Sequence, residues 1–149
     1  MNIKETLYKQ CQAFVEERFL TIQKTIHEIQ ESLTSETKSS AGDKHETGRA
    51  MLQLEREKAG QQLAEIQKTK ALLAKIDTPI SSKAITLGSL VLTSQANYFI
   101  AISAGELKVN NQSFYAISAH TPIAISLLGK TVGDKITFRE QNFEIIKVM

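Results

Sequence analysis

Apolar residues recur at helical spacing along the first half of the chain. Before residue 39 they stand alternately four and three positions apart, at Val15, Phe19, Ile22, Ile26, Ile29 and Leu33. Such steps keep one side of a helix apolar, as in the seam of a coiled coil. After residue 48 a similar spacing links Ala59, Leu63, Ile66 and Leu73, with Lys70 interrupting it. The pattern predicts two long helices, over residues 2–37 and 44–76, that pack along these seams.

A short polar segment, residues 39–48, separates the two helical patterns. Gly42 interrupts the first pattern, and Asp43 with Glu46 has the spacing of a capping box, in which two side chains bond backbone amides at the start of a helix. Two helices joined by a short polar turn form an antiparallel hairpin. At 1.5 Å per residue each arm is about 50 Å long. We therefore expect a coiled-coil hairpin over residues 1–78 with two carboxylates at its tip.

After a short linker at residues 79–83, the period changes at Ala84, where helical spacing gives way to alternation. Alternating runs separated by turn residues follow at 89–93, 98–102, 107–109, 113–117, 136–139 and 143–148. Before the last two runs, Thr121 is a suitable helix cap, Pro122 suits the first helical position, and Gly129 suits the end. We expect a second domain over residues 84–149, with an antiparallel sheet of about five strands and one short helix. The whole chain is then α+β.

Composition excludes several classes of function. The net charge is +2, which is too small for a protein that coats nucleic acid by electrostatics alone. No apolar run is long enough to span a membrane, and the N-terminus does not resemble a signal peptide. We therefore expect a cytoplasmic protein with no membrane partner. The one cysteine, Cys11, falls on the apolar face of the first helix and is expected to be a core residue.

The sequence contains no motif for a self-sufficient active site. It has no phosphate-binding loop, no dinucleotide fingerprint, no paired cysteines and no zinc-binding helix motif. The histidines His27, His45 and His120 are far apart in sequence, and each is expected to be exposed.

The tip carboxylates are the remaining candidates for chemistry. Two carboxylates one helical turn apart, Asp43 and Glu46, can share a hard cation such as Mg²⁺, but two protein ligands are too few for a tight site. If they hold a metal, they complete a site that another macromolecule mostly supplies. The same two residues also serve as a helix cap without any metal, and the spacing alone leaves both interpretations open.

Three cationic residues, Arg49, Arg56 and Lys58, follow the tip along the second helix. They form either a basic strip that leads away from the tip or, with the neighbouring glutamates, a solvated face with local ion pairs. Gly48 and Gly60 lie within the same helix, and each destabilises it by about 1 kcal/mol relative to alanine. The sequence offers no reason for these glycines.

One run of the second domain is similar to a known signature. Residues 121–134 read Thr-Pro-Ile-Ala-Ile-Ser-Leu-Leu-Gly-Lys-Thr-Val-Gly-Asp. This run resembles the Ser-Pro-Ile-x-x-x-Leu-Leu-Gly-Lys-x-x-Gly-Asp signature of bacterial Gre-type transcript cleavage factors. The tip, with Gly42, Asp43 and Glu46, is similar to that family's acidic tip and has the same interval between the acids. The order of parts also agrees, with a helical hairpin first and a small domain after it.

The resemblance implies an FKBP-like second domain that docks on RNA polymerase and a coiled coil that enters the polymerase secondary channel. There Asp43 and Glu46 would help hold a second Mg²⁺, shared with the polymerase, which then hydrolyses the 3′ end of backtracked RNA. The factor is an accessory and not itself a complete enzyme, and an FKBP-like fold brings no prolyl isomerase activity by itself. Residues 44–45 and 47–48 differ from the family pattern. Two alternatives therefore stay open: a channel-binding regulator or inhibitor without cleavage activity, and a coiled-coil scaffold protein.

Overall fold

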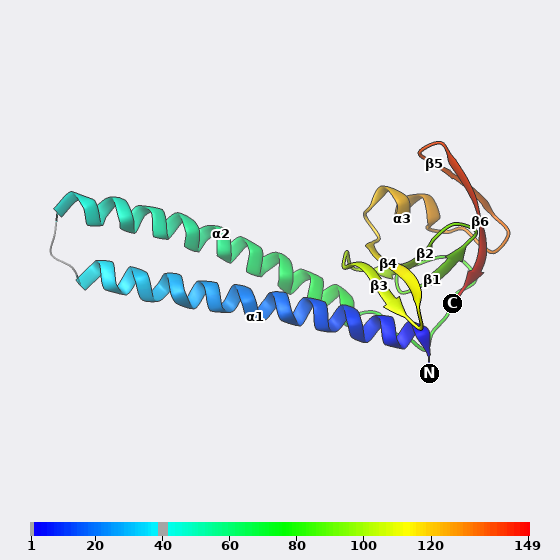
Figure 1. The fold of residues 1–149 in the computed structure, drawn as a ribbon, viewed down its shortest axis with the longest axis horizontal. Coiled ribbons are helices and arrows are strands. Elements are labelled where there is room, and N and C mark those ends of the chain that lie inside the picture. The colour runs from blue at the N-terminus through cyan, green and yellow to red at the C-terminus, as the bar shows by residue number, and fades with distance from the viewer. Residues whose placement is uncertain (1, 39–41) are drawn as a thin grey trace. The chain divides into compact units, whose positions relative to one another are not determined.

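The computed structural model describes the backbone of residues 2–38 and 42–149 and the side chains of residues 2–35 and 47–149. Over these residues the chain is α+β, with two long helices followed by a six-stranded mixed sheet and one short helix (Figure 1). The helices are α1 (Ile3–Lys38), α2 (Gly42–Ala74) and α3 (Pro122–Leu127). The strands are β1 (Leu90–Thr93), β2 (Asn97–Ala101), β3 (Gly105–Val109), β4 (Gln112–Ser118), β5 (Lys135–Phe138) and β6 (Gln141–Val148).

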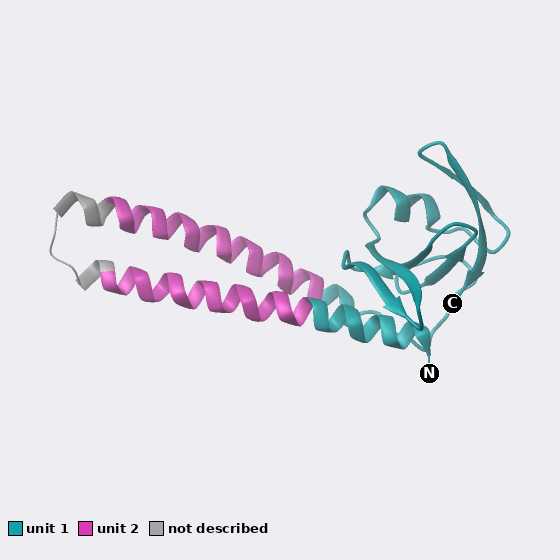
Figure 2. Cartoon of the chain, in the orientation of Figure 1, with its two compact units in different colours: residues 1–14, 71–149 teal, residues 15–70 magenta. Residues whose placement is uncertain are grey.

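The chain divides into two compact units (Figure 2). Residues 15–70, most of the two long helices, form one unit, which we call the helical unit. Residues 1–14 and 71–149 form the other, which we call the sheet unit. The first turns of α1, the end of α2 and the segment that connects α2 to β1 therefore belong with the sheet.

Apolar side chains from both helices pack together in the helical unit. Their buried members are Ile22, Ile29 and Ala59, and Ile26, Leu33, Leu52, Leu63 and Ile66 pack against them. The Nζ of Lys70 lies 3.3 Å from a carboxylate oxygen of Glu16, so an early turn of α1 lies beside a late turn of α2. The two helices therefore run antiparallel within this unit. The two long helices that the periodicity predicts are confirmed over the described residues.

The strand order in the sheet is β3-β4-β2-β1-β6-β5. All neighbouring pairs are antiparallel except β2 and β4, which run parallel with Tyr98 opposite Tyr115. All six predicted alternating runs are strands, one more than the expected sheet of about five, and the expectation of a purely antiparallel sheet is wrong for the pair β2 and β4.

The exception has a physical cause in the β3–β4 hairpin. Its turn is made by Asn110 and Asn111, which both have positive φ, and the chain reverses there after it has already reversed between β2 and β3. Two reversals leave β4 parallel to β2. The more apolar strand of the hairpin takes the inner place, since β4 buries Phe114 whereas β3 exposes Glu106 and Lys108. Charged side chains are well suited to an edge strand.

Both faces of the sheet are covered. On one face α3 packs over strand residues, in a cluster that contains Val91, Ile100, Ala124, Leu127 and Ile145. On the other face Leu90, Phe99 and Phe114 are also fully buried, as the alternation along a strand requires.

The first turns of α1 contribute to the core of the sheet unit. Leu7 and Cys11 are fully buried, and the Nε2 of Gln10 donates to the carbonyl of Lys108 at 3.1 Å. Burial raises the pKa of the Cys11 thiol to about 11. The expectation that Cys11 is a core residue is confirmed.

Candidate functional site

The predicted catalytic and metal-binding residues, Asp43 and Glu46, lie outside the residues whose side chains the structure describes, and so does His45. The described side chains resume at Thr47 on α2. Over the described side chains, no group of three or more His, Cys, Asp or Glu residues lies close enough together to hold a metal ion. The described side chains nearest to the tip in sequence are therefore those of α2 from Thr47 onward.

The helical geometry of α2 divides the predicted basic strip. Arg49 and Arg56 are seven residues apart, so they lie within about 20° of each other around the helix axis. Lys58 lies two residues beyond Arg56, about 200° around the axis, and its side chain is exposed. The structure thus places Arg49 and Arg56 on one face and Lys58 on another.

The predicted local ion pairs of this block are not present among the described side chains. The ion pairs there join His27 to Glu31, Lys68 to Glu65, and Lys70 to Glu16. None of them involves residues 55–58. Glu55, Glu57 and Lys58 are exposed, whereas Arg56 is partly buried. Arg56 therefore differs from the charged residues around it.

The run that resembles the family signature begins with α3. The Oγ1 of Thr121 accepts a hydrogen bond from the backbone N–H of Ala124 at 3.3 Å, and Pro122 stands in the first turn of the helix. Ala124 and Leu127 are fully buried against the sheet. The predicted cap and the predicted short helix are confirmed, and the helix is anchored by two apolar side chains.

The second half of this run turns the chain back onto the sheet. Gly129, with a φ of 83°, donates its N–H to the carbonyl of Ile85 at 2.8 Å, and Gly133, with a φ of 92°, donates to Ile145 at the same distance. Positive φ favours glycine at both positions. A carboxylate oxygen of Asp134 accepts from the N–H of Thr131 at 2.8 Å and closes the turn over residues 131–134, which contains Gly133. Most of the recognisable residues of the run therefore serve the fold.

Three side chains of the run are left facing solvent and have no such structural role. Ile125 and Val132 are 62 % and 59 % exposed, at positions that the signature leaves unspecified. Lys130 is also exposed, although the signature specifies it. Exposed apolar side chains beside a cation can contact a partner protein. The sequence alone gives no sign that Ile125 and Val132 are exposed together, whereas the signature itself marks Lys130.

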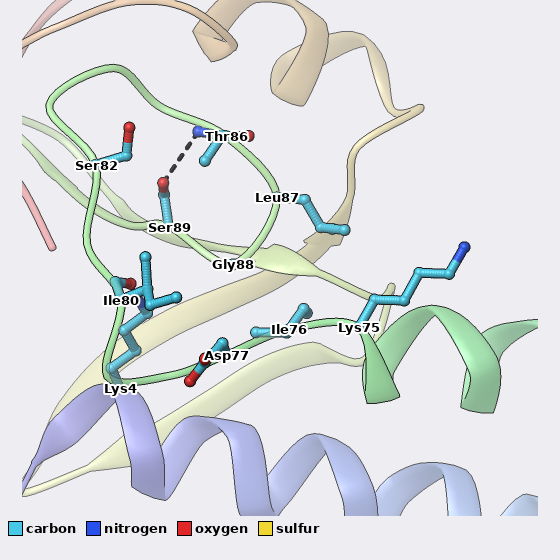
Figure 3. A pocket seen from close by; sticks show the side chains of 10 residues that line it. All are labelled: Lys4, Lys75, Ile76, Asp77, Ile80, Ser82, Thr86, Leu87, Gly88 and Ser89. Atoms are coloured by element: carbon cyan, nitrogen blue, oxygen red, sulfur yellow. Dashed lines mark hydrogen bonds between the residues drawn. The ribbon is translucent and has the colours of Figure 1, made fainter.

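A pocket inside the sheet unit is the other candidate site (Figure 3). Its volume is about 190 Å³, and it lies between the start of α1, the end of α2 and the segment that leads into β1. Lys4 is only 5 % exposed there, and its Nζ donates to the carbonyl of Ile80 at 2.8 Å. Burial lowers the pKa of Lys4, and the nearby Asp77 carboxylate opposes this shift.

The pocket residues fix the connecting segment in place. The Oγ of Ser89 accepts from the N–H of Thr86 at 3.0 Å, the bond dashed in Figure 3. Gly88 has a φ of 91°, and a Cβ at this position would lie 3.1 Å from Cγ2 of Ile76. Neither a histidine nor a cysteine lines the pocket. We therefore assign it a structural role in holding the start of β1 against the helices.

The two described histidines lie apart from these sites. His27 is exposed on α1, with its Nε2 3.3 Å from a carboxylate oxygen of Glu31. His120 is exposed before α3, and its backbone N–H donates to the hydroxyl of Ser118 at 3.2 Å. The expectation of exposed residues is confirmed for both.

No protein-family model matches the chain. No curated protein sequence matches it either. Among the helices of the described residues, none is long and apolar enough to cross a membrane.

Proposed function

We propose that the protein is a cytoplasmic accessory factor of RNA polymerase that enters the polymerase secondary channel and stimulates hydrolysis of backtracked RNA. The observation that carries this proposal is the order of parts. Two long antiparallel helices flank the acidic segment, and a sheet unit follows in which residues 121–134 form a capped helix and two glycine turns. A Gre-type factor is expected to have the same parts in the same order.

The helical unit suits entry into a channel. Its two helices share an apolar seam that contains Ile22, Ile29 and Ala59, which supports a coiled-coil hairpin. With about 10 Å for each helix, such a pair is about 20 Å across its wider direction, and the part of α1 from residue 15 to residue 38 is about 36 Å long. The apolar contacts from Ile22 to Leu33 hold the two helices together over part of this length and so stiffen the pair behind its tip.

Asp43 and Glu46 are the residues that we propose to hold Mg²⁺. Carboxylate oxygens are ligands that this ion prefers, and Mg²⁺ usually completes its shell with waters and substrate phosphates. The remaining ligands then come from the polymerase and from the RNA 3′ end. A second metal ion at such a site supplies an activated water and stabilises the charge that develops at the phosphate.

Arg49 and Arg56 are proposed to approach the RNA. Their shared face of α2 leads away from the tip, and a guanidinium group matches two phosphate oxygens at once. Lys58 stands on another face, so we leave it out of this strip.

The sheet unit, which we propose to be FKBP-like, is proposed to dock on the polymerase. Ile125 is exposed on α3, Lys130 and Val132 are exposed just after it, and the three form the candidate contact. The first turns of α1 supply the buried residues Leu7 and Cys11 to this unit, so docking is best tested with the full chain.

The test is RNA cleavage in a stalled, backtracked elongation complex of the source organism's polymerase. Wild type is compared with Asp43→Ala and Glu46→Ala, and with Glu57→Ala as an exposed acid elsewhere on α2. The proposal predicts shortened RNA with wild type and with Glu57→Ala only, while all four proteins bind. Binding without cleavage by wild type would indicate a channel-binding regulator, and absence of binding would indicate a scaffold protein.

A further inference from the structure

Gly60 stands in the interior of α2, where glycine disfavours a helix. The atom nearest to a Cβ built at this position is Nη1 of Arg56, at 3.1 Å. Arg56 precedes Gly60 by four residues, so the two are neighbours on one face of the helix. The Arg56 side chain therefore lies over the place that a side chain at position 60 would occupy.

Among the described side chains, no carboxylate holds the Arg56 guanidinium there. No ion pair or hydrogen bond joins it to any described side chain, and the exposed Glu55 and Glu57 on either side do not pair with it. Residue Arg56 is nevertheless partly buried, and its Nη1 lies 3.1 Å from the place that a Cβ of residue 60 would take. Its N–H donors are thus available to an acceptor from another molecule.

From this contact we infer that Gly60 is a positioning residue for Arg56. The missing side chain gives the guanidinium a place against α2, on the face that it shares with Arg49, and so limits the orientations that Arg56 samples before it meets an RNA phosphate. A side chain that is ordered beforehand loses less conformational entropy on binding. This inference rests on the proposed function, because that function supplies the phosphate.

The inference gives Gly60→Ala an unusual combination of effects. Alanine favours the helix, and the displaced atom is the end of a flexible side chain, so the protein should become more stable. The same methyl group moves Arg56 from its place, so activity on RNA should fall. If Gly60 did not position Arg56, Gly60→Ala would raise stability and leave the activity on RNA unchanged.

The experiment combines Gly60→Ala and Arg56→Ala, singly and together, in the full chain. Thermal unfolding is followed by circular dichroism, and RNA cleavage is measured in the backtracked elongation complex. Gln61→Ala, an exposed position on the same helix, is the matched control. We expect Gly60→Ala to favour the folded state by up to about fivefold and to slow cleavage by about three- to tenfold. We expect no further slowing by Gly60→Ala when Arg56 is already alanine.

Two outcomes would overturn the inference by itself. One is wild-type cleavage by Gly60→Ala in an assay where Arg56→Ala is slow. The other is a stability gain from Gly60→Ala that is the same with and without Arg56, because a side chain that has to move should make the gain smaller when Arg56 is present. Failure of the wild-type protein to bind the polymerase would instead overturn the proposed function. The proposed contact between Arg56 and an RNA phosphate would then be overturned as well.

Discussion

The Nζ of Lys70 lies 4.1 Å from the centroid of the Phe19 ring, across the interface between the two long helices. The same atom lies 3.3 Å from Glu16. Lys70 is the residue that interrupts the apolar seam of α2, and the structure shows how the seam accommodates it. Its charge meets an aromatic face and a carboxylate of α1 in place of an apolar partner. A polar group with specific partners at a seam position favours one register of the helices over others.

Reversing the charge at this position should destabilise the helical unit. Lys70→Glu replaces two attractions by repulsion from Glu16, and we expect the free energy of unfolding to fall by about 1 kcal/mol. The measurement is thermal unfolding at low and at high salt, where salt should reduce the loss. Lys68→Glu is the control, because the described partner of Lys68 is Glu65, on an exposed face of α2. An equal loss in both variants would contradict a special role for the Lys70–Phe19 contact.

Gly88 should tolerate alanine poorly. Its φ of 91° disfavours an L side chain, and the new Cβ would lie 3.1 Å from Cγ2 of the buried Ile76. We expect Gly88→Ala to lower the free energy of unfolding by about 2–3 kcal/mol. Gly105→Ala is the matched control, because Gly105 has a φ of 76° with nothing within 4 Å of the built Cβ. Gly105→Ala should lower the free energy of unfolding by about 1 kcal/mol, and urea unfolding measures both variants. Equal losses would show that the contact with Ile76 adds nothing.

Lys4 should make the free energy of unfolding depend on pH in the alkaline range. Burial lowers its pKa in the folded state, so the ammonium group loses its proton at a lower pH in the folded protein than in the unfolded chain, where the pKa is about 10.5. Between these two pKa values the unfolded chain binds more protons, and stability from this group therefore rises with pH. We expect the free energy of unfolding of wild type, relative to Lys4→Met, to increase as pH rises towards 10.5. Urea unfolding at pH 7 and at pH 10 measures it, with the exposed Lys9→Met as control. A difference that is constant or falls with pH would contradict this assignment.

The exposed residues beside α3 should contribute to polymerase binding. Ile125→Asp places a charge on a side chain that is 62 % exposed, so folding should be unaffected. If Ile125 contacts the polymerase, burial of that charge should weaken binding by about tenfold or more. Ile146→Asp, at a 52 % exposed position on β6 outside the signature run, is the control. Equal affinities for wild type and Ile125→Asp would exclude this face as the docking surface.

The sequence predicted those parts of the fold that local patterns determine. The spacing from Val15 to Leu33 was sufficient for α1, because a helix places such residues on one side whatever it packs against. Thr121 and Pro122 were sufficient for the start of α3, because a cap depends on its immediate neighbours.

The parallel pairing of β2 with β4, which the sequence did not predict, depends on contacts between residues that are distant in sequence. Whether β3 or β4 pairs with β2 is decided by which strand buries more apolar surface, and Phe114 only shows its effect once the sheet is assembled. Each strand can be recognised from its own alternation of apolar and polar residues. Which strand it pairs with in the sheet cannot be recognised from that alternation.

The candidate site depends in part on local sequence. The spacing of Asp43 and Glu46 marks them as a pair, and their role stays a prediction. The division of the basic strip follows from helix geometry alone, since Lys58 is two residues from Arg56. The contact between Gly60 and Arg56 was not predictable from the sequence, because it depends on the direction that one long side chain takes.

The central claim is that Asp43 and Glu46 hold a magnesium ion at the polymerase active site. The most direct measurement is the rate of RNA cleavage in the backtracked complex as a function of Mg²⁺ concentration, with wild type, Asp43→Asn and Glu46→Gln at saturating factor. The amides keep the size of each side chain and remove its charge. We predict that both variants require a higher Mg²⁺ concentration for half-maximal cleavage and that high Mg²⁺ partly restores the rate. The same Mg²⁺ dependence for all three proteins would contradict the claim.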